Sequence, residues 1–243
     1  MPVGIICNAA AIAIGGILGA LVGHKLSEEL KTKIQMIFGA CSMAMGISTI
    51  VLMRNMPAVI FSVILGTALG VLIHLESKIH AAGAGMQRVI SKFVRTDNTE
   101  ISKEEFMATL ITVIVLFCSS GTGIYGAIVS GMNGDHSILI AKSILDLFTA
   151  MIFACTLGMV VSVIAVVQLV IFLILFVCAG LIFPLTTPEM IEDFKACGGI
   201  LMLATGFRMI KVKMFPTADM IPAMILVMPV SYVWMEYVLP YVS

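Results

Sequence analysis

The sequence contains little charge, and this scarcity argues against a soluble globular protein. Only 12% of its 243 residues are charged, whereas 60% are hydrophobic. A soluble domain of this length would need more charged side chains to cover its outer face. Apolar stretches of roughly fifteen to twenty-five residues instead recur from Gly4 to Val238, separated by short polar joints. The composition therefore predicts an integral membrane protein.

Motifs for enzymatic and metal chemistry are also missing. The sequence has no Walker loop, GxSxG elbow, HExxH or paired-carboxylate motif, so we expect neither an enzyme nor a cofactor. Positive and negative charges balance, so the whole-chain charge says nothing about nucleic-acid or acidic partners. No nucleic-acid partner is expected for this membrane protein. The four histidines have no HxxxH or HxxE spacing, so we expect no metal site. They are His24, His74, His80 and His136.

The six cysteines have no CxxC spacing, and all lie in or beside apolar stretches. We expect them to be buried, reduced thiols that pack as small hydrophobic side chains, without disulfides. They are Cys7, Cys41, Cys118, Cys155, Cys178 and Cys197.

The apolar stretches predict an all-α, polytopic bundle of about eight membrane-spanning helices. Eleven of the fourteen basic residues lie in or beside the first, third and seventh joints, which an eight-helix count places on one side. The positive-inside rule puts that side in the cytoplasm and both termini outside. The expected spans are roughly 4–23, 34–53, 57–75, 106–130, 138–160, 163–183, 196–210 and 218–238.

The segment from Glu76 to Phe106 is the only sizeable polar stretch. Its apolar residues, spaced among basic ones, indicate an amphipathic helix on anionic lipid headgroups. A solvated connector remains the alternative.

The chain aligns with itself at an offset of 160 residues, and the next proline-led stretch follows after a five-residue insertion. The first three helices would then match the last three and cross the membrane in the opposite sense, as in many secondary transporters. Chance similarity remains open, because glycine and alanine are common in membrane helices. The aligned pairs are Asn8 with Gln168, Ser27 with Thr187, Glu29 with Glu189, Gly39 with Gly199, and Gly46 with Gly206.

Ser27 and Thr187 are predicted N-caps of their helices. The repeat divides the chain into four expected parts. These are a first three-helix repeat (1–75), a cytoplasmic amphipathic connector (76–105), a central two-helix unit (106–160) and a second, inverted three-helix repeat (161–243).

The stretch from Ser137 to Val160 carries charge inside an apolar span. Lys142 and Asp146 are four residues apart, so they share a helix face and are expected to pair. An unpaired charge there would cost about 3 kcal/mol, so the pair should face protein or a water-filled cavity. Ser143 and Thr149 could add oxygen ligands. The alternative is a structural ion pair with Lys142 reaching outward.

The fourth span is interrupted by Cys118-Ser119-Ser120-Gly121-Thr122-Gly123. Two glycines among hydroxyl residues favour an unwound helix whose backbone groups could coordinate an ion or solute, although packed membrane helices also tolerate glycine. The turn at Asn133-Gly134-Asp135-His136 follows it.

Asn8 and Gln168 are further candidates, although a lone amide in a membrane helix more often bonds a neighbouring helix than a substrate. Glycines spaced four apart (Gly15, Gly19 and Gly23; Gly66 and Gly70) predict close helix contacts within the chain or between subunits, so a homo-oligomer is compatible with the sequence.

Three segments of the sequence are distinctive: the opening Ile6–Gly19, Asn133-Gly134-Asp135 running into Ala141–Asp146, and Ala196–Phe207 with its glycines. In these segments the chain resembles the bacterial membrane family known as domain of unknown function 554. The resemblance covers essentially the whole chain and implies a bacterial inner-membrane protein without an assigned substrate. Where the family leads us to expect Gly-Pro in the fourth helix, this chain has Gly121-Thr122-Gly123, which leaves the local bend in question.

The leading functional hypothesis is a secondary transporter of a small solute or ion across the bacterial cytoplasmic membrane. Asp146 would bind a cation or proton with Lys142 as counter-charge, and Asn8 and Gln168 would be symmetry-related contacts. Rocking of one three-helix repeat against the other would alternate access. The alternative is a membrane scaffold or regulatory protein without transport, whose partners are lipid and other helices. Candidate solute ligands are Ser119, Ser120, Thr122 and Ser143.

Overall fold

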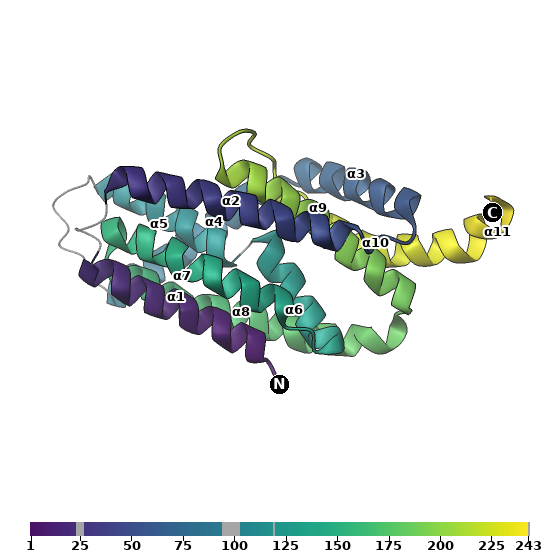
Figure 1. The fold of residues 1–243 in the computed structure, drawn as a ribbon, viewed down its shortest axis with the longest axis horizontal. Helices are drawn as coiled ribbons and strands as arrows, with labels where there is room; N and C mark the ends of the chain where they lie inside the picture. Colours follow the sequence, from purple (N-terminus) through teal and green to yellow (C-terminus); the bar gives the residue numbers. More distant parts are fainter. Residues whose placement is uncertain (23–26, 94–102, 119, 243) are drawn as a thin grey trace. The chain divides into compact units, whose positions relative to one another are not determined.

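The computed structural model describes residues 1–22, 27–93, 103–118 and 120–242, and these residues form helices and no strand (Figure 1). The all-α prediction is confirmed. The helices are α1 (Val3–Val22), α2 (Glu28–Ile50), α3 (Met56–Leu72), α4 (Leu75–Phe93), α5 (Lys103–Cys118), α6 (Gly121–Asn133), α7 (Ser137–Leu157), α8 (Val160–Ile182), α9 (Pro188–Met209), α10 (Pro222–Val233) and α11 (Leu239–Val242), with the 3₁₀ helix η2 (Phe183–Leu185) and the π-helix η3 (Trp234–Val238).

Fewer helices than expected are long and apolar enough to cross a membrane. Six described segments qualify, or up to seven if the bent pair of α3 and α4 counts as one span, against the eight predicted. Two expected spans account for the difference. Helix α3 has only 17 residues, and α9 carries Glu192, Asp193 and Lys195 within its length.

Helix α3 ends just before His74, whose φ of 53° lies in the left-handed region. His74 ends the α-helix of α3, because an L-residue with positive φ does not continue a right-handed helix. The expected amphipathic segment begins with α4, whose helix extends to Phe93.

The outer surface is apolar over much of its area. Leu21, Ile64 and Leu181 are 65%, 65% and 74% exposed. Surfaces of this kind are unfavourable in water and suit contact with lipid chains. The expectation that all six cysteines are buried is wrong. Cys7, Cys41 and Cys178 are free thiols but are exposed on this surface.

The chain forms two compact units, each drawn from both halves of the sequence. Unit 1 comprises Met1–Gln35 and Ser77–Gly180, and unit 2 comprises Met36–Glu76 and Leu181–Ser243. Unit 1 therefore holds α1 together with α5 to α7 and most of α8, whereas unit 2 holds α3, α9 and α10.

In unit 1, α1 and α7 lie side by side along their lengths (Figure 1). Two glycines of α1 allow this approach. A Cβ on Gly15 would lie 2.2 Å from the carbonyl oxygen of Leu147, and one on Gly19 would lie 2.1 Å from that of Met151. The close contact predicted from the glycine spacing is confirmed for these two residues.

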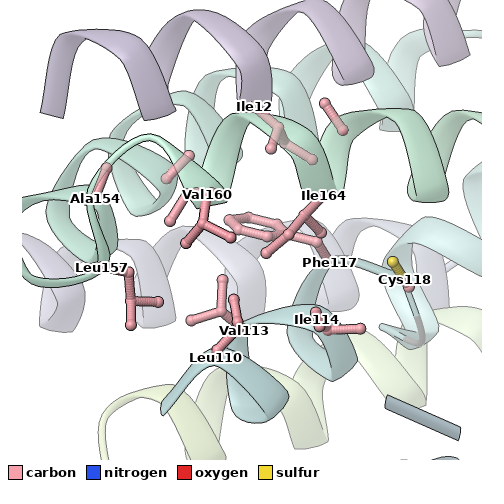
Figure 2. Close-up of a cluster of buried hydrophobic side chains, with 13 residues drawn as sticks. Ile12, Leu110, Val113, Ile114, Phe117, Cys118, Ala154, Leu157, Val160 and Ile164 are labelled. Carbon is pink, nitrogen blue, oxygen red and sulfur yellow. The ribbon is translucent and has the colours of Figure 1, made fainter. Parts of the chain in front are cut away.

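An apolar cluster fills the interior of unit 1. In Figure 2, Ile12 of α1, Phe117 of α5, Ala154 of α7 and Ile164 of α8 belong to this cluster, and all are buried. Asn8 lies one helical turn before Ile12 on α1. The apolar cluster therefore lies next to Asn8 along α1.

In unit 2, α3 packs against α10, where a Cβ on Gly66 would lie 2.4 Å from the backbone of Ala223. Helices α2 and α9 also touch through glycines. A Cβ on Gly46 would lie 2.7 Å from the carbonyl oxygen of Gly199, and one on Gly199 would lie 2.8 Å from that of Gly46. The contact is thus reciprocal.

Both predicted N-caps are confirmed. The Ser27 hydroxyl accepts from the backbone N–H of Leu30 at 3.3 Å, and that of Thr187 accepts from Met190 at 3.3 Å. Helix α9 therefore begins at Pro188, eight residues earlier than the span expected from Ala196.

Candidate functional site

Four polar side chains form one hydrogen-bonded chain inside unit 1. The Nε2 of Gln168 donates to Oδ1 of Asn8, and Asn8 Nδ2 donates to Asp146 Oδ2 at 2.8 Å. Lys142 Nζ donates to the same oxygen at 2.5 Å. We call these residues, from Gln168 through Asn8 and Asp146 to Lys142, the polar chain.

The polar chain joins α1 to the consecutive helices α7 and α8, which lie far from it in the sequence. Asn8 lies on α1, Lys142 and Asp146 on α7, and Gln168 on α8. Helix α8 is held beside α1 by a hydrogen bond from the Ser162 hydroxyl to the carbonyl oxygen of Ala13 at 3.0 Å. Small residues thus bring α7 and α8 close enough to α1 for two amides to reach the carboxylate.

All four side chains are removed from the surface. Asn8 and Gln168 are 0% exposed, and Lys142 and Asp146 are 4% and 6% exposed. The Lys142 ammonium also lies over the Phe117 ring, 6.0 Å from its centroid. The predicted pairing of Lys142 and Asp146 is confirmed. The expectation that Lys142 could reach outward is wrong, because its ammonium is buried against α5.

One acceptor in the polar chain has no partner. Among the described residues, Gln168 Oε1 is the buried side-chain oxygen or nitrogen that lacks a hydrogen bond. Both donors to Asp146 bond Oδ2, so no described residue bonds its second oxygen. Buried polar groups in folded proteins are almost always bonded, and an exception calls for an explanation. The polar chain is therefore incomplete at Gln168 Oε1, and Asp146 keeps one oxygen that no described residue bonds.

The predicted hydroxyl ligands do not complete it. Ser143 and Thr149 are buried on α7, but each donates to its own helix, to the carbonyl oxygens of Leu139 at 2.7 Å and Leu145 at 2.8 Å. Hydroxyls bonded in this way satisfy their donors locally. Neither hydroxyl therefore donates to Asp146.

The expected interruption between α5 and α6 is present. Ser120 has extended backbone angles and caps α6, and its hydroxyl accepts from the backbone N–H of Gly123 at 3.1 Å. Gly121 and Gly123 lie in the first turn of α6, where Thr122 is buried. Ser119 lies outside the described residues.

The turn after α6 is a capped connection. Asn133 Oδ1 accepts from the Asp135 backbone N–H, and Asp135 Oδ1 accepts from the N–H and hydroxyl of Ser137. Gly134 has a φ of 74°, which glycine adopts without strain. These side chains are engaged in ordering the turn and not in the polar chain.

Unit 2 contains a second buried carboxylate that the sequence analysis did not single out. Asp193 is 0% exposed, and its Oδ1 accepts from the backbone N–H groups of Arg54 and Asn55, both at 2.8 Å. Its Oδ2 accepts from Asn55 Nδ2 at 2.8 Å and from the Ser231 hydroxyl at 2.6 Å. Asp193 thereby connects α9 with α10 and the start of α3.

The helix-start signal at Thr187 could have identified Asp193 as a residue inside a helix. The Thr187 cap followed by Pro188 and Glu189 indicates a helix that begins there, so Asp193 falls inside a helix and not in a joint.

Within the described residues, no group of three or more His, Cys, Asp or Glu side chains could hold a metal ion.

Comparison with known proteins gives a family without an assigned activity. The model of the family described as protein of unknown function (DUF554) matches residues 3–232. The uncharacterized protein YqgA of Escherichia coli (strain K12) is 47% identical over 234 residues, covering 96% of this chain and 98% of that protein. The uncharacterized membrane protein YdfK of Bacillus subtilis (strain 168) is 25% identical over 229 residues, covering 92% and 93%. No solved structure matches.

Proposed function

This chain belongs to the DUF554 family, whose description assigns no activity, and from its own residues we propose that it is a secondary transporter of a small solute or ion in a bacterial cytoplasmic membrane. The proposal includes no enzymatic reaction. Its expected partners are the lipid bilayer and the transported species.

The observation that carries the proposal is the incomplete polar chain. A buried ion pair in apolar helices is unfavourable to maintain, and replacing such a pair by apolar residues is often neutral or stabilising. Ionisable groups at membrane depth commonly mark ion or solute paths. The unpartnered Gln168 Oε1, which the polar chain links through Asn8 to Asp146, therefore fits a site that receives a ligand.

Contacts between aligned residues support the inverted repeat. In a two-fold arrangement, if one residue contacts a second, their symmetry mates also contact each other. The aligned Asn8 and Gln168 hydrogen-bond one another in unit 1. In unit 2, Gly39 lies against Gly206, and their aligned partners Gly199 and Gly46 lie against each other.

The repeat and the compact units together define the moving parts of the proposed transporter. Matched helices pack against each other, α1 with α8 in unit 1 and α2 with α9 in unit 2. The parts that shift during transport would thus be the two units and not the two sequence repeats. The basic joints are on the cytoplasmic side in this proposal, and both termini are outside.

A thermal-stability screen of the detergent-purified protein tests the proposal. The panel contains monovalent and divalent ions, amino acids, carboxylates and nucleosides at two pH values. A ligand that binds only the folded form raises the melting temperature by mass action. We expect a shift in the parent protein that is lost in Asp146→Asn and kept in the control Glu192→Gln, whose partner is the exposed Arg54.

The absence of any ligand-dependent shift would favour the alternative function, a membrane scaffold without transport activity. No shift across the panel, with Asp146→Asn as stable as the parent, would mean that the polar chain only holds helices together. Cysteines placed along the Asp146 face of α7 would then fail to react with water-soluble reagents, whereas a transporter would expose them in one state.

A further inference from the structure

We propose that the segment between α9 and α10 is a binding surface for anionic phospholipid headgroups at the face of the membrane. The surface consists of residues 211–215, and we call it the basic loop. The inference does not depend on the transport function, because a scaffold would bind lipid through the same residues. It rests on how the loop is held, on what it exposes, and on where the apolar surface of unit 2 ends.

Backbone hydrogen bonds order the start of the basic loop. The N–H of Lys211 donates to the carbonyl oxygen of Arg208 at 3.1 Å, and the N–H of Val212 donates to that of Phe207 at 3.2 Å. This pair of bonds is a Schellman motif, in which the residue just after the helix adopts left-handed backbone angles. Lys211 takes that position, with a φ of 57°.

A lysine at this position is uncommon, because glycine is the residue that usually ends a helix in this way. A side chain with positive φ is crowded by its own backbone, and residues held in such angles cluster at functional sites. The Lys211 side chain is exposed, so the fold itself makes little use of it. Lys211 is therefore a candidate for binding something outside the protein.

Arg208 holds the far end of the basic loop. Its guanidinium donates to the carbonyl oxygen of Phe215 at 3.1 Å and to the hydroxyl of Thr217 at 3.3 Å. It also donates to the Glu76 carboxylate at 2.8 Å, which neutralises its charge. The Phe215 ring lies against Phe207, with ring centroids 5.9 Å apart. The loop is therefore attached at both ends.

Between these attachments, cations alternate with exposed apolar side chains. Lys211 and Lys213 are exposed, and neither has an ion pair with a described residue. Val212 and Met214 are 67% and 65% exposed. Lysines near a membrane surface attract anionic headgroups, and apolar side chains beside them enter the boundary between headgroups and acyl chains. A free anion in water would leave the apolar side chains exposed, so the combination favours a lipid surface.

The basic loop lies where the apolar surface of unit 2 ends. Leu72, the last residue of α3, is 73% exposed, and Glu76 follows it with its bond to Arg208. After the loop, the chain enters the candidate membrane span Pro222–Tyr241. Asp219 lies between them, but it is buried and accepts from the backbone N–H of Glu76 at 2.8 Å, so its charge faces the start of α4. These positions put the two lysines at headgroup level.

Quenching of tryptophan fluorescence by brominated lipid tests the inference. Trp234 is the single tryptophan of the chain, so Trp234→Phe gives a silent background for Met214→Trp. The full chain is reconstituted into vesicles of phosphatidylcholine and phosphatidylglycerol, with bromine at the same acyl position of one lipid or the other. At equal mole fraction, we expect the brominated phosphatidylglycerol to quench more strongly. Ile225→Trp, on the exposed apolar surface of α10, is the control and should be quenched equally by both lipids.

Three variants locate the preference. Lys213→Gln and Lys211→Gly should each raise the phosphatidylglycerol fraction needed for half-maximal quenching about fivefold. Lys211→Gly should also melt at or above the temperature of the parent, because glycine takes a positive φ without strain, so its effect cannot come from a damaged fold. Lys33→Gln removes another exposed lysine, paired with Glu29, and should leave the preference unchanged.

Four results would overturn the inference. Equal quenching of the Met214→Trp protein by the two lipids would mean that the loop enters the membrane without selecting charge. Quenching by neither lipid would place the loop in water, where an acidic protein would be the remaining partner. A preference that persists with both lysines replaced would assign it to other basic residues. A preference abolished by inorganic phosphate at matched ionic strength would indicate a site for free phosphate.

Discussion

The two buried carboxylates of this protein differ in how completely they are bonded. Asp193 accepts four hydrogen bonds from neutral donors, two on each oxygen. Asp146 accepts only two, both on one oxygen, and one of them comes from Lys142. Each also has an asparagine partner, Asn55 or Asn8. A carboxylate whose oxygens all accept hydrogen bonds from the protein holds the fold together, whereas a carboxylate with an oxygen left unbonded can receive a ligand.

The same substitution at both positions should separate these roles, with the largest stability loss at Asp193. Asp193→Asn replaces two accepting lone pairs with an N–H₂ group that faces the donors of Asn55 and Ser231. It also removes negative charge from the start of α3, and we expect a loss of about 3 kcal/mol. Asp146→Asn should lose less, because Asp146 accepts two hydrogen bonds whereas Asp193 accepts four. Thermal melting of both variants in the same detergent checks the order.

This order is itself a test of the comparison. If Asp146→Asn unfolded the protein while Asp193→Asn melted like the parent, Asp146 would be the structural carboxylate. The assignment of the ligand site to unit 1 would then be wrong.

The second-largest effect should come from removing Lys142 alone. Lys142→Met leaves the Asp146 carboxylate buried without its cation, which we expect to cost about 2–3 kcal/mol. Adding Asp146→Asn removes that charge and should recover most of the loss, giving a coupling of about 2 kcal/mol in a double-mutant cycle. Additive losses in the cycle would show that the two residues are not paired in solution.

Part of this site could be predicted from sequence because it depends on short spacing. Lys142 and Asp146 are four apart, so the geometry of one helix brings them together. The caps at Ser27 and Thr187 also act locally. The repeat alignment matched Asn8 with Gln168, but local rules could not show that they bond each other. That contact depends on how α1 and α8 pack.

The remaining features depend on tertiary structure. Asp193 lies in a charged stretch that is expected to be a polar joint, and only the packing of α10 and the start of α3 buries it. The unpartnered Gln168 Oε1 follows from the direction of every other bond in the polar chain. Among the described residues, six or seven segments are long and apolar enough to cross a membrane, against the eight predicted. An apolar stretch does not reveal whether its charged neighbours join the same helix, as in α9.

Removing one hydrogen bond from the Asp193 cluster or from the polar chain should have a smaller effect on stability, and the effect should differ between the two. Ser231→Ala removes a 2.6 Å hydrogen bond to a buried carboxylate, and we expect a loss of about 1.5–2 kcal/mol. Gln168→Met removes a bond to Asn8 but also eliminates the unpartnered oxygen, so the net change should be within about 0.5 kcal/mol. Chemical or thermal unfolding of the two variants measures both. A Gln168→Met loss as large as that of Ser231→Ala would mean that Gln168 is fully bonded in solution.

Removing a helix cap in either unit should cost still less stability. Thr187 caps α9 in unit 2, and Ser120 caps α6 in unit 1. Each alanine substitution should cost about 1 kcal/mol, and Thr187→Ser should restore the parent stability. Melting temperatures of the three variants test this. If Ser120→Ala alone also weakened ligand binding, the break between α5 and α6 would belong to the site.

The smallest expected effect is a pH dependence at the start of α9. Hydrogen bonds from its own backbone N–H and from the Thr187 hydroxyl lower the pKa of Glu189 below its usual value. A carboxyl with a lowered pKa stabilises the fold above its normal pKa, and this contribution disappears as the pH falls through the lowered value. Thr187→Ala removes the second of these bonds, so the pKa of Glu189 should rise toward its usual value. The melting-temperature difference between the parent and Thr187→Ala should therefore narrow on acidification, but a remainder should persist from the lost cap to Met190. A difference that stayed constant with pH would assign the whole effect to the cap and none to Glu189.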